Sequence, residues 1–330
     1  MKKITTVLLA SACMMAACGG ASEKEAQKDN GAAQEQLSEP AVKIPAFNAD
    51  SAYAYVAKQV SFGPRIPNSD AQRKCADWMI ATLKQWADDV HVQETTVKGG
   101  DGKSLKCINV IASFNPQVQK RVMLMSHWDT RPWTDEDPAN PTGKLDGADD
   151  GASGVGVLME LARMFKGQKP DVGVDIVFTD VEDYGKSEHG EASYALGTQY
   201  WAKNPHVPNY KASYGILLDM VGGKNATFPM EGYSLQYAPD IVRGVWNAAA
   251  SLGYGNVFQQ QQGGTITDDH YFVNTIAGIP TIDIIGLRNS PSSPFQEHWH
   301  TSKDNMDVID RVTLKKVGET VAKVVYENNL

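Results

Sequence analysis

The sequence predicts an α/β fold in which a mixed β-sheet has helices on both faces. The first two expected strands are the β-rich runs 90–98 and 104–114, and the segment 99–102 between them, Gly-Gly-Asp-Gly, is a hairpin signal. Apolar strands and helical patterns then alternate to the end of the chain. A hairpin followed by strand–helix repeats is typical of a sheet that contains both antiparallel and parallel pairs.

The individual elements follow from local signals. Asp50 and Ser51 can cap a first helix that runs to about Val60, and 68–70, Asn-Ser-Asp, can cap a second helix with apolar residues at helical spacing. After the hairpin, the apolar run 121–126 predicts a third strand. The remaining expected elements are helix 151–165, strand 172–179, helix 193–203, strand 214–221, helix 240–252, strand 279–285 and helix 312–328.

Composition excludes several classes of protein. The 330 residues are 42% hydrophobic and 21% charged, which is typical of a globular protein with a substantial core. The formal net charge is −8, and no basic tract is clustered, so we expect no nucleic-acid partner. Four cysteines are too few for a disulfide-built scaffold. Cys75 and Cys107 could form one disulfide or be two buried apolar residues.

The N-terminal segment predicts export and membrane attachment. Lys2 and Lys3 precede an apolar run that is too short to span a bilayer, so residues 1–17 are expected to be a signal peptide. The run ends in Met-Ala-Ala-Cys, which resembles a bacterial lipobox with Cys18 as the lipidated residue. Alternatively, the segment is an ordinary secretory signal and Cys18 is incidental. Residues 18–47 then form a polar tether, and 48–330 the catalytic domain, in the bacterial cell envelope, periplasm-facing or outer-membrane associated.

Acidic and histidine side chains gather where the expected strands end. Taken one at a time, Asp146 and Asp149, and also Asp269, can be explained as helix caps or as solvated loop residues. This explanation does not account for acidic and histidine residues after so many strands at once. Several like charges in one cleft require a cation between them. The segments are Ser126–Asp129, Asp146–Gly151, Asp180–Asp183, Asp219, Asp268–His270 and His298–His300.

Histidine combined with carboxylates favours Zn²⁺ in a catalytic site, where three protein ligands leave one position open. The adjacent pair Glu182 and Asp183 is the most informative, because neighbouring side chains after a strand point in different directions. One of them can coordinate the metal while the other acts as a general base.

These residues together resemble the zinc-dependent aminopeptidase-like family, which also contains the animal-type glutaminyl-peptide cyclotransferases. The resemblance runs from about residue 48 to the C-terminus and implies a three-layer α/β/α sandwich with a twisted mixed central sheet. Three segments are similar to the cyclotransferase branch: 217–229, 266–270 and 293–301. Thr267 departs from the glutamine of the animal enzymes. The motifs that carry the resemblance are 147–154 (GADDGASG), Ser126–Asp129, Glu182-Asp183, Asp219 and His300-Thr301.

The resemblance implies one Zn²⁺ per chain, with Asp150, Asp183 and His300 as ligands. Asp183 stands where the animal enzymes have glutamate. Asp149 competes with Asp150 as a ligand, and His298 competes with His300, but the family motif favours Asp150 and His300 and makes His298 a rim residue. His127 and Asp129 form the pair that holds a second zinc in aminopeptidases, and here they are expected outside the first metal's ligand set or at a vacant second site.

The implied reaction converts the N-terminal glutamine of peptides and proteins to pyroglutamate and releases ammonia. Glu182 would move the proton, and Asp219 and Asp268 would bind near the amide nitrogen. A pocket for the glutamine side chain would be lined by Trp299, Phe295, Ile266 and Tyr194.

Two other functions stay open: a di-zinc aminopeptidase of the same fold, and an inactive binding module. The segment 129–146, rich in proline, aspartate and tryptophan, is a candidate cover for the cleft.

Overall fold

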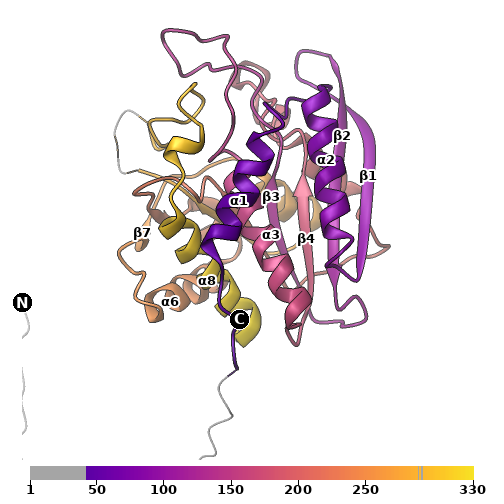
Figure 1. The fold of residues 1–330 in the computed structure, drawn as a ribbon, viewed down its shortest axis with the longest axis vertical. Coiled ribbons are helices and arrows are strands. Elements are labelled where there is room, and N and C mark those ends of the chain that lie inside the picture. The colour runs from indigo at the N-terminus through magenta and orange to yellow at the C-terminus, as the bar shows by residue number, and fades with distance from the viewer. Residues whose placement is uncertain (1–41, 289, 291–292) are drawn as a thin grey trace, which may run out of the picture. The chain divides into compact units, whose positions relative to one another are not determined.

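A six-stranded mixed sheet forms the middle layer of the protein (Figure 1). The computed structural model describes residues 42–288, 290 and 293–330. The expected signal peptide, Cys18 and the tether as far as residue 41 lie outside the described residues. The helices and strands are α1 (Ala49–Val60), α2 (Asp70–Leu83), β1 (Asp89–Lys98), β2 (Ser104–Phe114), β3 (Arg121–His127), α3 (Ala152–Gly167), β4 (Gly173–Thr179), α4 (Leu196–Lys203), β5 (Tyr214–Asp219), β6 (Phe228–Met230), α5 (Gly232–Tyr237), α6 (Pro239–Ser251), β7 (Phe258–Gln262), α7 (Asp269–Phe272), β8 (Thr281–Ile285) and α8 (Arg311–Glu327).

The strand order in this sheet is β1-β2-β4-β3-β5-β8. β1, β2 and β4 pair antiparallel, whereas β4, β3, β5 and β8 pair parallel. The chain leaves β3, enters β4 on one side of it and then β5 on the other. In open α/β sheets, ligands bind where the strand order reverses in this way, at the carboxyl ends of the strands.

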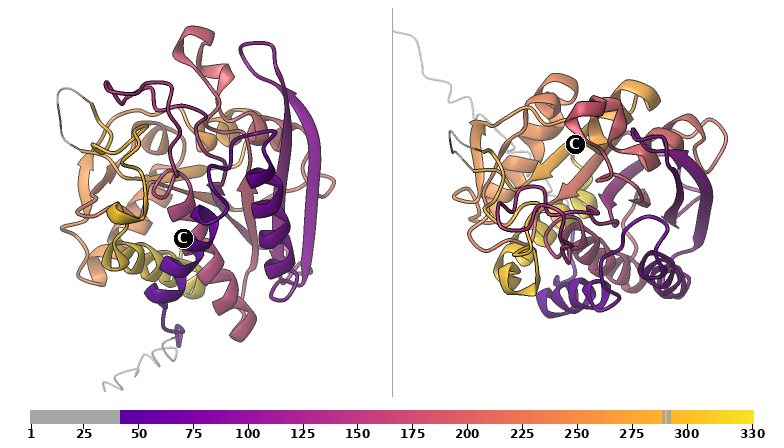
Figure 2. Two further views of the ribbon diagram at one scale, coloured as in Figure 1. Left: turned by 45° about the horizontal axis from the view of Figure 1, so that its top comes forward. Right: turned by 90° about the horizontal axis from the view of Figure 1, so that it is seen from above.

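Alternating side chains of the central strands separate two apolar layers. Leu124 and Ile176 face the larger core, which α1, α2, α3, α6 and α8 cover. Met123 and Val177 face a smaller core that includes Trp201 of α4. Figure 2 shows the helices on both sides of the sheet, so the expected three-layer α/β/α sandwich is confirmed. Cys75 and Cys107 are buried and free, and therefore act as apolar residues.

Several elements differ from the sequence prediction. The expected helix 193–203 begins only at Leu196, because Ala195 has a left-handed backbone (φ 51°) that interrupts the helix. Two short 3₁₀ turns precede it, Ser187–His189 and Glu191–Ser193. β8 begins at Thr281, because Pro280 has no N–H to donate to the sheet. The sequence did not predict the second, two-stranded sheet of β6 and β7, or the short helices α5 and α7.

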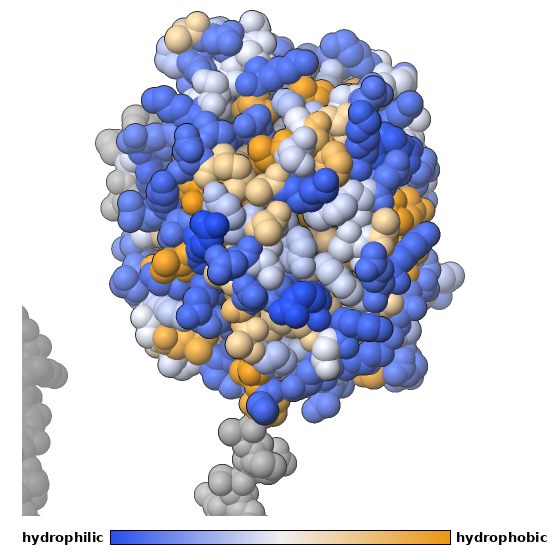
Figure 3. Space-filling view, in the orientation of Figure 1, coloured by the Kyte–Doolittle hydropathy of each residue, from blue (hydrophilic) through white to orange (hydrophobic). Residues whose placement is uncertain are grey.

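The face of the molecule that carries α1 is largely hydrophilic, with scattered apolar residues (Figure 3). Large exposed apolar side chains in the described part of the chain are Val42, Val92, Val207, Leu252 and Val312. None of the described helices combines the length and the apolar character needed to cross a bilayer.

Candidate active site

The predicted site residues come together at the carboxyl ends of the parallel strands. His127 and Asp219 are the last residues of β3 and β5, and Glu182 lies in the turn after β4. Asp150 lies just before α3, and His300 lies in the long connection between β8 and α8. All five side chains are at least nine-tenths buried. The site therefore forms where the topology predicts a ligand-binding crevice.

Asp150, Asp183 and His300 each offer a ligand atom to one small space. The Nε2 atom of His300 lies 3.3 Å from Oδ1 of Asp183 and 3.6 Å from Oδ2 of Asp150. One atom from each residue lies within 4.8 Å of the others. Oδ2 of Asp183 is buried and has no hydrogen-bond partner among the described residues. One imidazole and two carboxylates, with a buried oxygen left unpartnered, fit a divalent ion such as zinc.

The charges in this group stabilise one another. Burial opposes ionisation of Asp183, but His300 and Arg131 outweigh it and hold the pKa of Asp183 below its usual range. Burial likewise opposes protonation of His300, and Asp183 and Asp135 outweigh it and raise the pKa of His300 to about 9. A proton on His300 thus partly offsets the carboxylates when no cation is bound, and a metal would have to displace it.

His127 lies beside the same group, on its other side. Its Nε2 atom is 2.9 Å from Oδ1 of Asp150 and 3.2 Å from Oδ1 of Asp219. These three residues form a second set of converging ligand atoms. Asp150 belongs to both sets, so the donor chemistry is compatible with one ion or with two.

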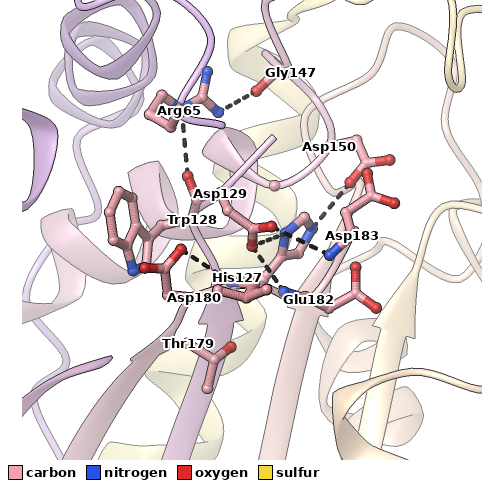
Figure 4. Close-up of polar contacts among 12 residues, drawn as sticks. Arg65, His127, Trp128, Asp129, Gly147, Asp150, Thr179, Asp180, Glu182 and Asp183 are labelled. Carbon is pink, nitrogen blue, oxygen red and sulfur yellow. Dashed lines mark hydrogen bonds and ion pairs between the residues drawn. The ribbon is translucent and has the colours of Figure 1, made fainter. Parts of the chain in front are cut away.

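Asp129 binds the protein backbone (Figure 4). Its two carboxylate oxygens accept hydrogen bonds from the backbone N–H groups of Glu182 (3.0 Å) and Asp183 (3.2 Å). Oδ1 also lies 3.4 Å from Nδ1 of His127. Asp129 therefore links the end of β3 to the turn that carries Glu182 and Asp183.

The Glu182 side chain lines the cavity and has no hydrogen-bond partner among the described residues. Burial raises the pKa of Glu182 well above its usual range, and the neighbouring Asp268 raises it further. A carboxyl group with a raised pKa can exchange a proton near neutral pH, which is what a general acid and base requires.

Asp219 and Asp268 both line the cavity, and Asp219 affects the ionisation of Asp268. Burial raises the pKa of Asp219 to about 6, and Asp150 contributes to the shift. Burial also raises the pKa of Asp268 well above its usual range, and Asp219 contributes. Both carboxyl groups therefore hold a proton more readily than an ordinary aspartate.

A cavity of about 260 Å³ opens onto these groups. Its apolar wall includes Phe295 and Trp299, whose rings stack with centroids 4.1 Å apart, and Trp299 also stacks on His300 at 3.6 Å. Tyr194 and Ile266 complete the expected lining. The cavity is therefore apolar on one side and acidic at the metal-ligand group. The described residues that line it are Asp150, Glu182, Asp183, Ser187, Tyr194, Asp219, Met220, Thr265, Ile266, Thr267, Asp268, Ile285, Phe295, Trp299 and His300.

Residues 109–325 match the family model described as peptidase family M28. The chain belongs to this family. The match spans every parallel strand and every metal-ligand candidate described above.

Solved structures resemble this chain over most of its length. A crystal structure of a Zn-dependent exopeptidase from Parabacteroides distasonis is 52% identical, covers 86% of this chain and 99% of its own, and has a TM-score of 0.84. A glutaminyl cyclase from Bacteroides thetaiotaomicron, solved with N-acetylhistamine, is 49% identical with the same coverage and a TM-score of 0.84. Glutaminyl-peptide cyclotransferase of Bos taurus is 26% identical over 66% of this chain, and the alignment spans 65% of the bovine protein.

Three sequence interpretations of neighbouring residues were wrong. Asp149 and Asp269 are buried, and neither is a solvated loop residue. Asp149 does not cap α3 either: its Oδ1 accepts the N–H of Gly222 and its Oδ2 lies 2.8 Å from Nε2 of His298. His298 is consequently buried in this contact and does not line the rim of the cavity.

Arg65 is a site-supporting residue that the sequence analysis missed (Figure 4). Its buried guanidinium donates to the backbone carbonyls of Trp128, Asp146 and Gly147. It thus fixes the end of β3 against the loop that carries Asp150. The sequence shows only that Arg65 lies between the first two expected helices, and this position does not indicate which groups its side chain contacts.

A buried acidic cluster behind Asp268 was also missed. His270 Nε2 pairs with Glu231 at 3.0 Å, and its Nδ1 lies 3.8 Å from Asp283 of β8. Burial raises the pKa of Asp283 well above its usual range, with a contribution from Asp268. The aspartate within the apolar run 279–285 was the signal that could have drawn attention to it.

Proposed function

We propose that this protein is a glutaminyl-peptide cyclotransferase that converts N-terminal glutamine to pyroglutamate. The observation that carries the proposal is the cavity in which an unbonded Glu182 carboxyl faces the pair Asp219 and Asp268 beside the metal-ligand group. The similarity to bacterial and animal glutaminyl cyclases supports it. The substrates would be peptides and proteins that begin with glutamine.

In this proposal the substrate's own α-amine attacks its γ-amide carbon, a C–N bond forms, and ammonia leaves. A divalent ion, zinc by its donor set, held by Asp150, Asp183 and His300 would supply Lewis acidity toward the amide oxygen. Glu182 takes a proton from the attacking amine and delivers it to the departing ammonia, so the enzyme ends unchanged. Asp219 and Asp268 hold the amide nitrogen, and the wall of Phe295 and Trp299 keeps the side chain folded back.

Mass spectrometry of a glutamine-initiated peptide, incubated with zinc-loaded protein, tests the proposal. Loss of one ammonia with the chain length intact is the expected result. Release of a free N-terminal amino acid would instead indicate an aminopeptidase. This alternative is favoured by the second set of possible metal ligands, His127, Asp150 and Asp219. An unchanged peptide would indicate a binding module.

The Glu182→Gln variant tests the proton-transfer role. We expect turnover to fall by about 10²–10⁴-fold while bound zinc is retained, because the amide cannot accept the proton. Glu191→Gln is the matched control, since this residue is exposed and does not line the cavity. If the Glu182→Gln variant turns over substrate at the wild-type rate, the proposed proton-transfer role of Glu182 is wrong.

For localisation, we propose attachment to the cell envelope through a lipid on Cys18. The motif at residues 15–18 supports this proposal. When the full chain is expressed in a bacterium with labelled palmitate, the label and membrane association should disappear in Cys18→Ser but persist in Cys13→Ser. Equal labelling of the two variants would contradict it.

A further inference from the structure

The loop between β3 and α3 reaches the metal-ligand group from outside the cavity. Arg131 and Asp135 both belong to this loop, and neither lines the 260 Å³ cavity. Arg131 is only 2% exposed. A buried guanidinium is costly unless its N–H groups are all satisfied, so its partners indicate what it stabilises.

Arg131 connects the loop to the turn after β4. Its Nε and Nη2 atoms donate to the two oxygens of Asp135 at 2.7 and 2.5 Å, a bidentate pair. Its Nη1 donates to Oδ1 of Asp183 at 3.0 Å and to the carbonyls of Asp183 and Gly185, both at 3.1 Å. Arg131 thus bonds one oxygen of Asp183 and leaves Oδ2 without a partner.

Asp135 connects the same loop to the third ligand candidate. Its Oδ1 lies 3.4 Å from Nδ1 of His300, and the N–H of Glu136 donates to the carbonyl of His300 at 3.2 Å. His300 has a left-handed backbone (φ 54°), which a non-glycine residue adopts only where its surroundings hold it. A carboxylate at Nδ1 keeps the proton there and leaves Nε2 as the metal-binding atom.

We infer that Arg131 and Asp135 form an outer clamp that orients two of the metal ligands, Asp183 and His300. Asp135 selects the imidazole tautomer that presents Nε2. Arg131 fixes Asp135 relative to Asp183 and offsets the negative charge of both when the metal is absent. The two are positioning residues, and the inference rests on the proposed metal site but not on the proposed reaction.

Zinc affinity, measured by competition with a chromophoric chelator, tests the clamp. Asp135→Asn should weaken zinc binding by about 10–100-fold, the usual effect of losing a partner that orients a ligand. Arg131→Lys should weaken it as well, because lysine cannot form the two-pronged contact while it bonds Asp183. Glu136→Gln is the matched control. Asp135 and Glu136 are both exposed, but only Asp135 contacts His300 and Arg131 through its side chain, so removing the charge of Glu136 should leave the affinity within about twofold.

Two further measurements separate orientation from stability. Unfolding of each variant in excess chelator shows whether the metal-free fold has changed, and the visible spectrum of the Co²⁺-loaded protein reports ligand geometry. We expect an altered Co²⁺ spectrum in Asp135→Asn, together with the weaker zinc binding. Wild-type affinity in both Asp135→Asn and Arg131→Lys would overturn the clamp, even if either variant unfolded more easily. If the zinc affinities change as expected but the wild-type protein does not cyclise peptides, the proposed reaction is refuted and the clamp is not.

Discussion

Asp129→Asn is the substitution that best distinguishes a backbone anchor from a metal ligand. Asp129 is buried and accepts the N–H groups of both Glu182 and Asp183. Asparagine keeps the shape but can accept only one of these bonds, and its amide N–H₂ then faces the other backbone donor. An unsatisfied buried N–H costs about 1–3 kcal/mol, and replacing an ionised acceptor with a neutral one costs about 1 kcal/mol more. The expected loss in the free energy of unfolding is therefore about 2–4 kcal/mol.

Guanidinium denaturation in excess chelator is the appropriate assay, because no metal then contributes to stability. Asp171→Asn is the matched control, since Asp171 is exposed, and it should change the free energy of unfolding by less than about 0.5 kcal/mol. A loss that appears only when zinc is present would mean that Asp129 acts as a ligand. A loss below about 0.5 kcal/mol in chelator would refute the backbone argument itself.

Three other predictions follow from the described contacts. Burial opposes ionisation of Glu231, but hydrogen bonding to His270 outweighs it and lowers the pKa of Glu231 from 4.5 to about 2. The ionised carboxylate therefore stabilises the fold by up to about 3 kcal/mol above pH 4.5, and this contribution is lost as the pH falls toward 2. The stability difference between wild type and Glu231→Gln, followed by urea denaturation, should shrink over that pH range, and a constant difference would contradict the lowered pKa of Glu231. Gly197→Ala should cost about 1–3 kcal/mol in thermal unfolding, because a Cβ would overlap the carbonyl oxygen of Asp180, and unchanged stability would show that α4 can shift. Zinc at about 100 times its dissociation constant should stabilise the wild-type protein by about 2.7 kcal/mol in a thermal shift assay. The same zinc concentration should leave the unfolding temperature of His300→Ala nearly unchanged. Equal increases in the unfolding temperature of the two proteins would mean that the ion binds elsewhere.

The fold and the location of the site were predictable because they depend on local patterns. Apolar runs such as 121–126 predicted the central strands, and the acids after them predicted the edge of the sheet where a ligand binds. β6 and β7 escaped prediction for a physical reason. β7 is Phe258 followed by four glutamines, which have no strand preference, and it forms a strand because its backbone pairs with β6.

The residues that support the site could not be predicted in the same way. Arg65 and Arg131 act through carbonyls and carboxylates that lie far away in the sequence, and their roles exist only after the chain has folded. Asp149 was misinterpreted because an aspartate just before a helix usually caps it, whereas here Gly222 and His298 take its oxygens. Sequence patterns thus predict which residue types gather, and long-range contacts decide what each one binds.

Asp150, Asp183 and His300 come from three distant parts of the chain, so the group that they form exists only when those parts have folded together. His300 is held in place by a loop that precedes α3, and α8, which follows His300, closes the core against α1 and α3. A chain cut short before this last helix would expose the apolar surface that α8 covers. The three side chains therefore converge only in the folded chain, and an ion bound by them would favour the folded state over the unfolded one.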